Sequence, residues 1–206
     1  MSDHEALLQS SDFQNYLSVQ LAFRCVAKEL HNYVDTKLKA IHQAIYTECS
    51  TYPPCQQNCS ETWKETHRWC QTCKKWKEKI SKRIRPRRRK IDWDKMRSHE
   101  WPHNYRKLGK IFAHQCWEEG KLNDVPTYLG IIESCNDFRL PNSVLELTKN
   151  IKDARNANIG HNASLELSDS NKTRMFYMLK QFVSAEEVKK EINASSLIQA
   201  LNNIEV

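Results

Sequence analysis

The sequence predicts an all-α fold, and three observations support this prediction. The chain of 206 residues contains only four glycines, which leaves little material for the tight turns of β-hairpins. Few stretches alternate apolar and polar residues, as half-buried strands do. Apolar residues instead recur every three or four positions over most of the chain, as they do in amphipathic helices. A chain of this length can bury one sizeable core and carry an insertion.

The first expected helix begins after Ser11 and extends to about Thr47. Ser11 and Gln14 have the spacing of a capping box, which supports this start. A break near His31 or Asn32 would give two helices, and this alternative stays open. One apolar face runs along the segment, formed by Phe13, Leu17, Leu21, Ala27, Leu30, Val34, Leu38, Ile41 and Ile45.

A different kind of segment follows Pro53 and Pro54, which end the helical pattern because proline lacks an amide donor. Residues 55–101 contain four clustered cysteines, five tryptophans and a dense basic run, with little helical periodicity before Trp69. We therefore expect three segments. Residues 1–54 and 102–206 would form a helical bundle, and residues 55–101 would be an insertion between its helices.

Helical patterns resume after the insertion. Further helices are expected over residues 105–112, 125–132, 143–154, 169–183 and 185–202. Asp124 is placed to cap the second of these, and capping boxes begin at Ser143 and Ser184. The apolar stripe of the helix that starts at Ser143 leads directly to Arg155.

The four clustered cysteines have the spacing of two chelating pairs. Cys55-x3-Cys59 and Cys70-x2-Cys73 are separated by ten residues. Tetrahedral zinc needs four ligands brought together by tight turns, and four sulfur ligands would leave no open position. The sequence therefore predicts a structural Zn²⁺ held by these four thiolates. The alternatives are four free thiols, or a site in which His67 replaces Cys55 or the more distant Cys49 supplies a ligand.

The charge of the chain favours an anionic partner. The formal net charge is +7 and the isoelectric point is near 9.0. The N-terminal residues lack a basic start and an apolar stretch, and no run approaches the length of about eighteen apolar residues that a membrane span needs. We therefore expect a cytoplasmic or nuclear protein with reduced cysteines, no membrane partner and no small-molecule cofactor.

The basic run, residues 82–90, carries seven positive charges in nine residues. Such a run can bind the phosphate backbone of RNA, while nearby Trp69, Trp76 or Trp93 stack on bases. A nuclear-import signal and a solvated loop are equally compatible with it. The candidate nucleic-acid contacts are Lys82, Arg83, Arg85, Arg87, Arg88, Arg89 and Lys90.

A second candidate site lies at the end of the helix that starts at Ser143. Arginine can hold a phosphate with its planar fork, and histidine can transfer a proton near neutral pH. In a continuous α-helix, Arg155 and His161 would be rotated by about 120° from each other. We expect Gly160 to end the helix in the left-handed conformation and to turn His161 back toward Arg155, with Asn156 orienting either group. The alternative is that Arg155 and His161 only complement the helix dipole.

The pattern formed by Arg155, Asn156 and His161, called the motif below, resembles the HEPN superfamily. Within that superfamily it is similar to the DZIP-like branch and to an animal family that pairs the motif with an upstream four-cysteine element. The resemblance implies a helical bundle that dimerises, so that two motifs form one composite site. It also implies metal-independent RNA cleavage, in which the 2′-hydroxyl attacks the adjacent phosphate and leaves a cyclic phosphate. Five residues separate Arg155 from His161, one more than the commonest spacing in the superfamily.

The resemblance also implies a role for each motif residue. Arg155 would bind phosphate, His161 would act in proton transfer, and Asn156 would support them. We therefore expect a homodimeric endoribonuclease that cleaves single-stranded RNA. The alternative is a non-catalytic RNA-binding or protein-assembly module with the same bundle. A zinc-dependent hydrolase or deaminase is disfavoured because no His/Cys-plus-Glu signature accompanies the cysteine pairs.

Overall fold

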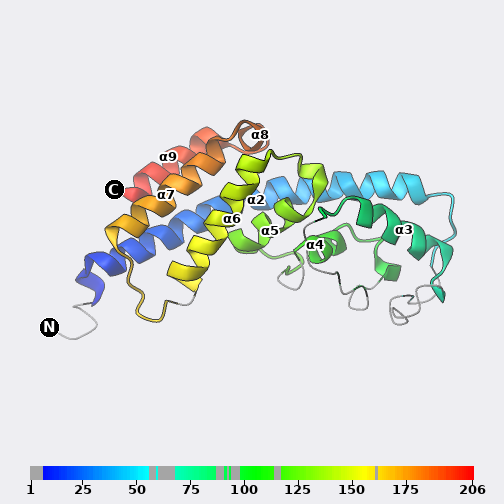
Figure 1. The fold of residues 1–206 in the computed structure, drawn as a ribbon, viewed down its shortest axis with the longest axis horizontal. Helices are drawn as coiled ribbons and strands as arrows, with labels where there is room; N and C mark the ends of the chain where they lie inside the picture. Colours follow the sequence, from blue (N-terminus) through cyan, green and yellow to red (C-terminus); the bar gives the residue numbers. More distant parts are fainter. Residues whose placement is uncertain are drawn as a thin grey trace. The chain divides into compact units, whose positions relative to one another are not determined.

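The computed structural model describes residues 7–55, 59, 68–86, 91, 93, 98–113, 117–160 and 162–206 (Figure 1). In these ranges all regular elements are helical, and the only extended pairing is an isolated antiparallel bridge between Ile84 and Cys135. The prediction of an all-α fold is thus confirmed. Within the same ranges, no helix is long and apolar enough to cross a bilayer.

The chain divides into two compact units by its internal contacts. Unit 1 comprises residues 1–33, 124–129 and 140–206, and unit 2 comprises residues 34–123 and 130–139. Helices α2 (Ser11–Cys49) and α5 (Val125–Ser134) each contribute residues to both units. These units are defined by contacts within the chain and do not test the expected division into two bundle segments and an insertion. That division stays a prediction.

Helix α2 is continuous through His31 and Asn32, so the first expected helix does not break. No glycine or proline interrupts it, and its hydrogen-bonded ladder can therefore continue. The helix begins one residue earlier than the expected capping box would place it. Ser11 lies inside the helix, and the amide of Gln14 donates to the carbonyl oxygen of Ser10 over 3.1 Å.

The buried face of the first part of α2 differs from the expected one. Leu17 and Leu21 are 44% and 55% exposed, and the burial falls instead on a row of neighbouring positions that includes Asn15, Val19, Ala22, Phe23 and Val26. A buried polar side chain also lies on this face. The Asn15 side-chain amide donates to the carbonyl oxygen of Leu167 over 3.1 Å and to the Asp169 carboxylate over 2.8 Å.

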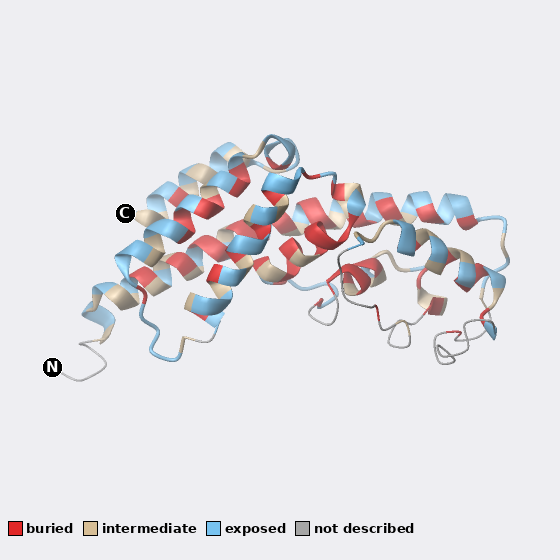
Figure 2. Cartoon of the chain, viewed as in Figure 1, coloured by how far each residue is buried: buried red, intermediate tan, exposed pale blue. Residues whose placement is uncertain are grey.

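Unit 1 is a helical layer built around α7 (Asp169–Ser184), which packs against α6 (Asn142–Arg155) and α9 (Ala194–Glu205). Figure 2 shows buried faces on these helices and exposed residues on the opposite faces. Helix α7 buries Met175, Phe176, Met178, Leu179, Phe182 and Val183. Burial of apolar surface stabilises a fold by about 25 cal/mol per Å², so these side chains stabilise the packing of unit 1.

The expected helix over residues 185–202 is two helices. Short helix α8 (Glu186–Lys189) ends before Asn193, whose side chain caps α9 by accepting a hydrogen bond from the amide of Ser196 over 3.4 Å. Asparagine is a preferred cap residue, and it therefore begins a new helix here.

The expected capping boxes at Ser143 and Ser184 are also wrong. Ser143 lies within α6, where Pro141 is the cap, and Ser184 is the last residue of α7.

Unit 2 contains the second part of α2 and three further helical elements: α3 (Gln71–Lys82), η3 (Ser98–Glu100) and α4 (Arg106–Phe112). The end of α5 and the short η5 (Asn136–Phe138) complete the described part of this unit. Its largest fully buried side chains include Trp76 and Trp101. Trp69 is also buried, at 2% exposure.

Base stacking by Trp69 and Trp76 is therefore excluded in this conformation, because both indoles lie in the core of unit 2. Trp93 is half-buried, and its ring centroid lies 5.9 Å from that of Trp101. The Lys77 ammonium group lies 4.9 Å and 5.3 Å from the ring centroids of Trp69 and Trp93. These cation–π contacts join the indoles to α3.

Candidate metal centre and Arg155 site

The cysteine cluster, which consists of Cys55, Cys59, Cys70 and Cys73, brings four sulfur atoms into one small volume. All four Sγ atoms lie within 4.8 Å of one another, and those of Cys55 and Cys59 are 3.7 Å apart. Zn–S bonds of about 2.3 Å in a tetrahedron place the sulfurs roughly 3.8 Å apart. The cluster is therefore compatible with a structural metal such as zinc.

The backbone around the cluster is folded by hydrogen bonds to sulfur. Cys70 is the cap residue of α3, and its Sγ accepts a hydrogen bond from the amide of Cys73 over 3.4 Å. The Sγ of Cys59 accepts one from the amide of Cys70 over 3.2 Å. The x2 spacing thus places one ligand at the cap and the other in the first helical turn. Amide donors aimed at sulfur stabilise the thiolate form that a metal requires.

The thiols do not share one electrostatic environment. Burial raises the pKa of Cys59 and that of Cys73 above the ordinary thiol value. Burial acts in the same direction on Cys70, but hydrogen bonds from the amide of Cys73 and from neighbouring thiols lower its pKa overall. A divalent cation would favour ionisation of all four, since it is the largest local charge in such a site.

Of the two alternative ligands, Cys49 is the one that the structure describes, and it is not part of the cluster. Cys49 is buried near the end of α2 and is absent from the group of four, and burial raises its pKa. His67 lies outside the described residues. The geometry therefore supports the ligand set that the two cysteine pairs predict, as far as the described part of the chain shows it.

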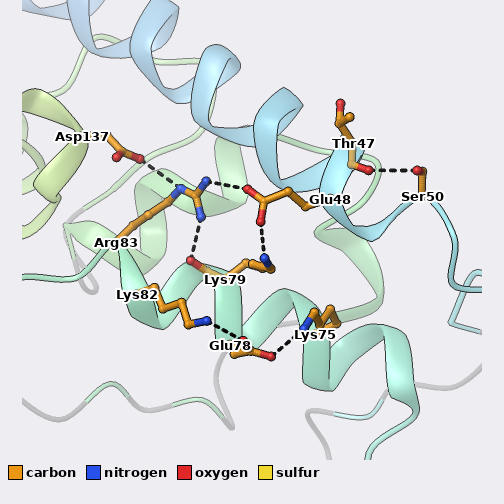
Figure 3. A network of polar contacts seen from close by, with 9 residues as sticks. All are labelled: Thr47, Glu48, Ser50, Lys75, Glu78, Lys79, Lys82, Arg83 and Asp137. Atoms are coloured by element: carbon orange, nitrogen blue, oxygen red, sulfur yellow. Dashed lines mark hydrogen bonds and ion pairs between the residues drawn. The ribbon is translucent and has the colours of Figure 1, made fainter.

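Arg83 of the basic run is committed to an internal network (Figure 3). Its guanidinium group contacts the Glu48 carboxylate at 3.2 Å and the Asp137 carboxylate at 3.0 Å, and it donates to the carbonyl oxygen of Lys79 over 3.0 Å. The side chain is only 17% exposed. Lys79 also pairs with Glu48, and hydrogen bonds from Lys79 and Arg83 lower the pKa of that carboxyl group. A phosphate could reach Arg83 only by breaking these contacts.

Arg85 also has internal partners. Its amide donates to the carbonyl oxygen of Ser134 over 2.9 Å, and its guanidinium donates to that of Cys135 over 3.3 Å. Lys82 is different, because its side chain is 65% exposed and, among the described residues, pairs with Glu78 on the same helix. The remaining candidates, Arg87, Arg88, Arg89 and Lys90, lie outside the described residues, so RNA contact by the basic run stays a prediction.

The motif begins where α6 becomes a π-helical turn, η6 (Asn156–Gly160). The expected left-handed glycine is wrong, since Gly160 has no positive φ. Its lack of a side chain serves a different purpose. A Cβ atom on Gly160 would lie 2.7 Å from Nη1 of Arg155 and 3.7 Å from Oδ1 of Asn156. Glycine therefore leaves the space that the Arg155 guanidinium occupies.

The π-helical turn explains how Arg155 reaches Gly160. Residues five apart differ by about 140° around an α-helix, whereas π-type hydrogen bonds link residues five apart and so reduce the angle between them. The turn thus places Arg155 over Gly160, the residue just before His161 in sequence. It also accommodates the five-residue spacer. His161 itself lies outside the described residues.

Two side chains hold the Arg155 guanidinium. Nη2 donates to Oδ2 of Asp124 over 3.2 Å, and Nη1 donates to Oδ1 of Asn156 over 3.4 Å. Asp124 also caps α5, because its Oδ1 accepts hydrogen bonds from the amide and the hydroxyl of Thr127, at 3.1 Å and 2.6 Å. The Arg155 side chain remains 28% exposed. An anion from solvent can therefore reach it.

Sequence reasoning identified Asp124 only as a helix cap. Its link to Arg155 spans 31 positions and joins residues that no local pattern relates. The described geometry of the motif thus provides a fixed, partly exposed guanidinium with an amide oxygen on one side and a carboxylate on the other. This arrangement can bind a phosphate group in the manner of an arginine fork.

The fold and these two sites define an all-helical protein with a four-cysteine cluster compatible with a metal and an arginine held on a π-helical turn. The chain belongs to the family described as "Domain of unknown function (DUF4559)", whose model matches residues 7–205. No curated protein and no solved structure matches this chain significantly.

Proposed function

We propose that this chain is a HEPN-type endoribonuclease that cleaves single-stranded RNA without a catalytic metal. The observation that carries the proposal is the position of the Arg155 guanidinium, which lies beside Asn156 and over Gly160, the residue that directly precedes His161 in sequence. A π-helical turn at this point adds support, since such turns are frequent at functional sites. The positive net charge suits a polyanionic substrate.

The proposed reaction uses the 2′-hydroxyl of RNA as the nucleophile. A histidine such as His161 accepts its proton, and the resulting oxygen attacks the adjacent phosphorus. The bond from phosphorus to the 5′-oxygen breaks, the leaving oxygen takes up a proton from solvent, and a 2′,3′-cyclic phosphate remains. Arg155 stabilises the charge on the non-bridging phosphate oxygens. Two copies of the motif in a homodimer complete the composite site.

The cysteine cluster has a structural role in this proposal. Four thiolates fill the tetrahedral positions of zinc and leave none for water or substrate. The metal therefore holds α3 against the segment that contains Cys55 and Cys59, and no catalytic step uses it. Lys82 and residues 87–90 add affinity for the RNA backbone. The protein would act in the cytoplasm or the nucleus.

Cleavage of a single-stranded RNA in magnesium-free buffer tests the proposal. EDTA sequesters free cations, and the zinc content of the protein is checked before and after the assay. We expect Arg155→Ala and His161→Ala each to reduce the cleavage rate by on the order of 10²–10⁴-fold, because each removes a group that acts in the transition state. A fully 2′-O-methylated oligonucleotide should resist cleavage.

Lys149→Ala is the matched control, since Lys149 is a 60% exposed cation on the same helix. It should cleave RNA at nearly the wild-type rate. Cleavage that persists in both motif variants would show that the activity arises elsewhere or from a contaminant. A purely monomeric protein at assay concentration, measured by light scattering, would contradict the composite site.

A non-catalytic RNA-binding or protein-assembly module is the second candidate. The observation in its favour is the Asp124 carboxylate, which already pairs with Arg155 and partly neutralises it. This function predicts RNA or protein binding without cleavage. It also predicts that His161→Ala leaves binding unchanged.

A further inference from the structure

The Asp124 carboxylate divides its two oxygens between two tasks. Oδ1 accepts hydrogen bonds from the amide and hydroxyl of Thr127 and so fixes the start of α5. Oδ2 lies 3.2 Å from Nη2 of Arg155. Because one oxygen is held by the helix, the other meets the guanidinium at a fixed position. Both side chains face solvent in part, at 50% exposure for Asp124 and 28% for Arg155.

Arg155 contacts Asp124 through one terminal nitrogen, whereas an arginine that binds phosphate commonly uses two N–H donors. Arginine forms its strongest ion pairs through two parallel N–H donors. Asp124 occupies one donor of Nη2, and the other terminal nitrogen turns to the neutral Asn156 amide oxygen at 3.4 Å. A partly exposed ion pair of this kind is weak, and a bidentate contact with phosphate can be stronger than it.

The negative charge of Asp124 also opposes an incoming phosphate directly. A phosphate that binds Arg155 would lie within a few ångströms of this carboxylate, where like charges repel. Rotation of the Asp124 carboxylate away from Arg155 would relieve the repulsion. The cap of α5 limits that rotation, since Thr127 holds Oδ1 through two hydrogen bonds.

We propose that Asp124 is an internal competitor of RNA phosphate for the Arg155 guanidinium, and that it sets the RNA affinity of the site. This inference rests on the proposed function. It adds that a carboxylate of the same chain controls how readily phosphate reaches Arg155. An RNA phosphate binds the Arg155 guanidinium in competition with Oδ2 of Asp124. The carboxylate thereby lowers the affinity of Arg155 for RNA phosphate and for free anions.

Asp124→Asn tests the inference, because asparagine is as good a cap as aspartate but carries no charge. The probe is a fluorescein-labelled, single-stranded 2′-O-methyl oligonucleotide, whose binding is measured by fluorescence anisotropy. The methyl groups block the nucleophile, so binding is measured without cleavage. We expect Asp124→Asn to bind about two- to fivefold more tightly than the wild type, as the loss of one exposed ion pair implies.

Two further variants separate the competition from a general change in charge. Asp153→Asn removes the same charge from an exposed position two residues before Arg155, and it should change the affinity much less. In an Arg155→Gln background, Asp124→Asn should no longer increase the affinity. This double-mutant cycle isolates the coupling between the two side chains.

An equal gain for Asp124→Asn and Asp153→Asn would overturn the inference, and so would a gain that survives in the Arg155→Gln background. Failure of every variant to bind the oligonucleotide would also overturn it. The proposed cleavage has a separate outcome. If the gain depends on Arg155 but unmodified RNA stays intact, Asp124 is a competitor at an RNA-binding site and the protein is not a nuclease.

Discussion

Replacing Cys73 by serine is expected to abolish stoichiometric zinc binding and to unfold the described part of unit 2 around α3. Cys73 is 1% exposed and lies in the first turn of α3, where its amide donates to Cys70. Structural zinc contributes apparent binding free energies on the order of 10–16 kcal/mol to folding, and serine is a poor replacement for a thiolate ligand. Loss of the metal therefore removes a large part of the stability of this unit.

Zinc content and thermal unfolding measure this effect together. We expect about one zinc ion per wild-type chain and a midpoint of unfolding that falls by about 10 °C or more in Cys73→Ser. Cys25→Ser is the control, since Cys25 lies in unit 1 and is absent from the cluster. It should retain zinc and unfold near the wild-type temperature. A Cys73→Ser protein with full zinc content and wild-type stability would show that the four sulfurs do not hold a structural metal.

Replacing Gly160 by alanine is expected to reduce RNA cleavage on the order of a hundredfold while the fold stays intact. The added Cβ would meet Nη1 of Arg155 at 2.7 Å, and the guanidinium must move. It is the end of a flexible side chain, so the movement costs little stability. Displacement of a phosphate-binding group by about 1 Å is nevertheless enough to reduce a rate by this factor.

Gly130→Ala provides the matched control for this substitution. A Cβ on Gly130 has no heavy atom within 4 Å apart from its immediate surroundings in the helix, so alanine fits there without displacement. This variant should cleave RNA at the wild-type rate and unfold at the same or a slightly higher temperature. If Gly160→Ala cleaves RNA as fast as Gly130→Ala, the position of the Arg155 guanidinium does not matter for the reaction.

The features that the sequence predicts well are those that depend on near neighbours. The cysteine pairs come together because x3 and x2 spacings bring two ligands each onto one turn, and only one short connection separates the pairs. Helix α4 and the start of α5 follow from apolar periodicity and from the Asp124 cap. In each case the physical cause acts over a few residues.

The features that the sequence does not predict depend on distant partners. Leu17 and Leu21 fit an apolar face but are exposed, and the buried face of α2 includes Asn15, which contacts the distant Leu167. Arg83 looks like part of a solvated basic run, yet Glu48 and Asp137 hold it within unit 2. Such pairings require the tertiary structure, since neither partner carries a local signal.

The Arg155 site combines both situations. The sequence predicts a site formed by Arg155, Asn156 and His161, which stays a prediction, and it assigns Gly160 the wrong conformation. The π-helical turn is not encoded in any short pattern that distinguishes it from an α-helical end. Asp124 was recognisable as a cap and not as the partner of Arg155.

The chemical nature of the 3′ end that remains on the RNA tests the central claim most directly. After incubation of the wild-type protein with a defined single-stranded RNA in magnesium-free buffer with EDTA, mass spectrometry identifies the fragments. The proposed mechanism predicts 2′,3′-cyclic phosphate ends paired with 5′-hydroxyl ends, and their absence with Arg155→Ala. Intact RNA, or fragments with 3′-hydroxyl and 5′-phosphate ends, would contradict attack by the 2′-hydroxyl at this site.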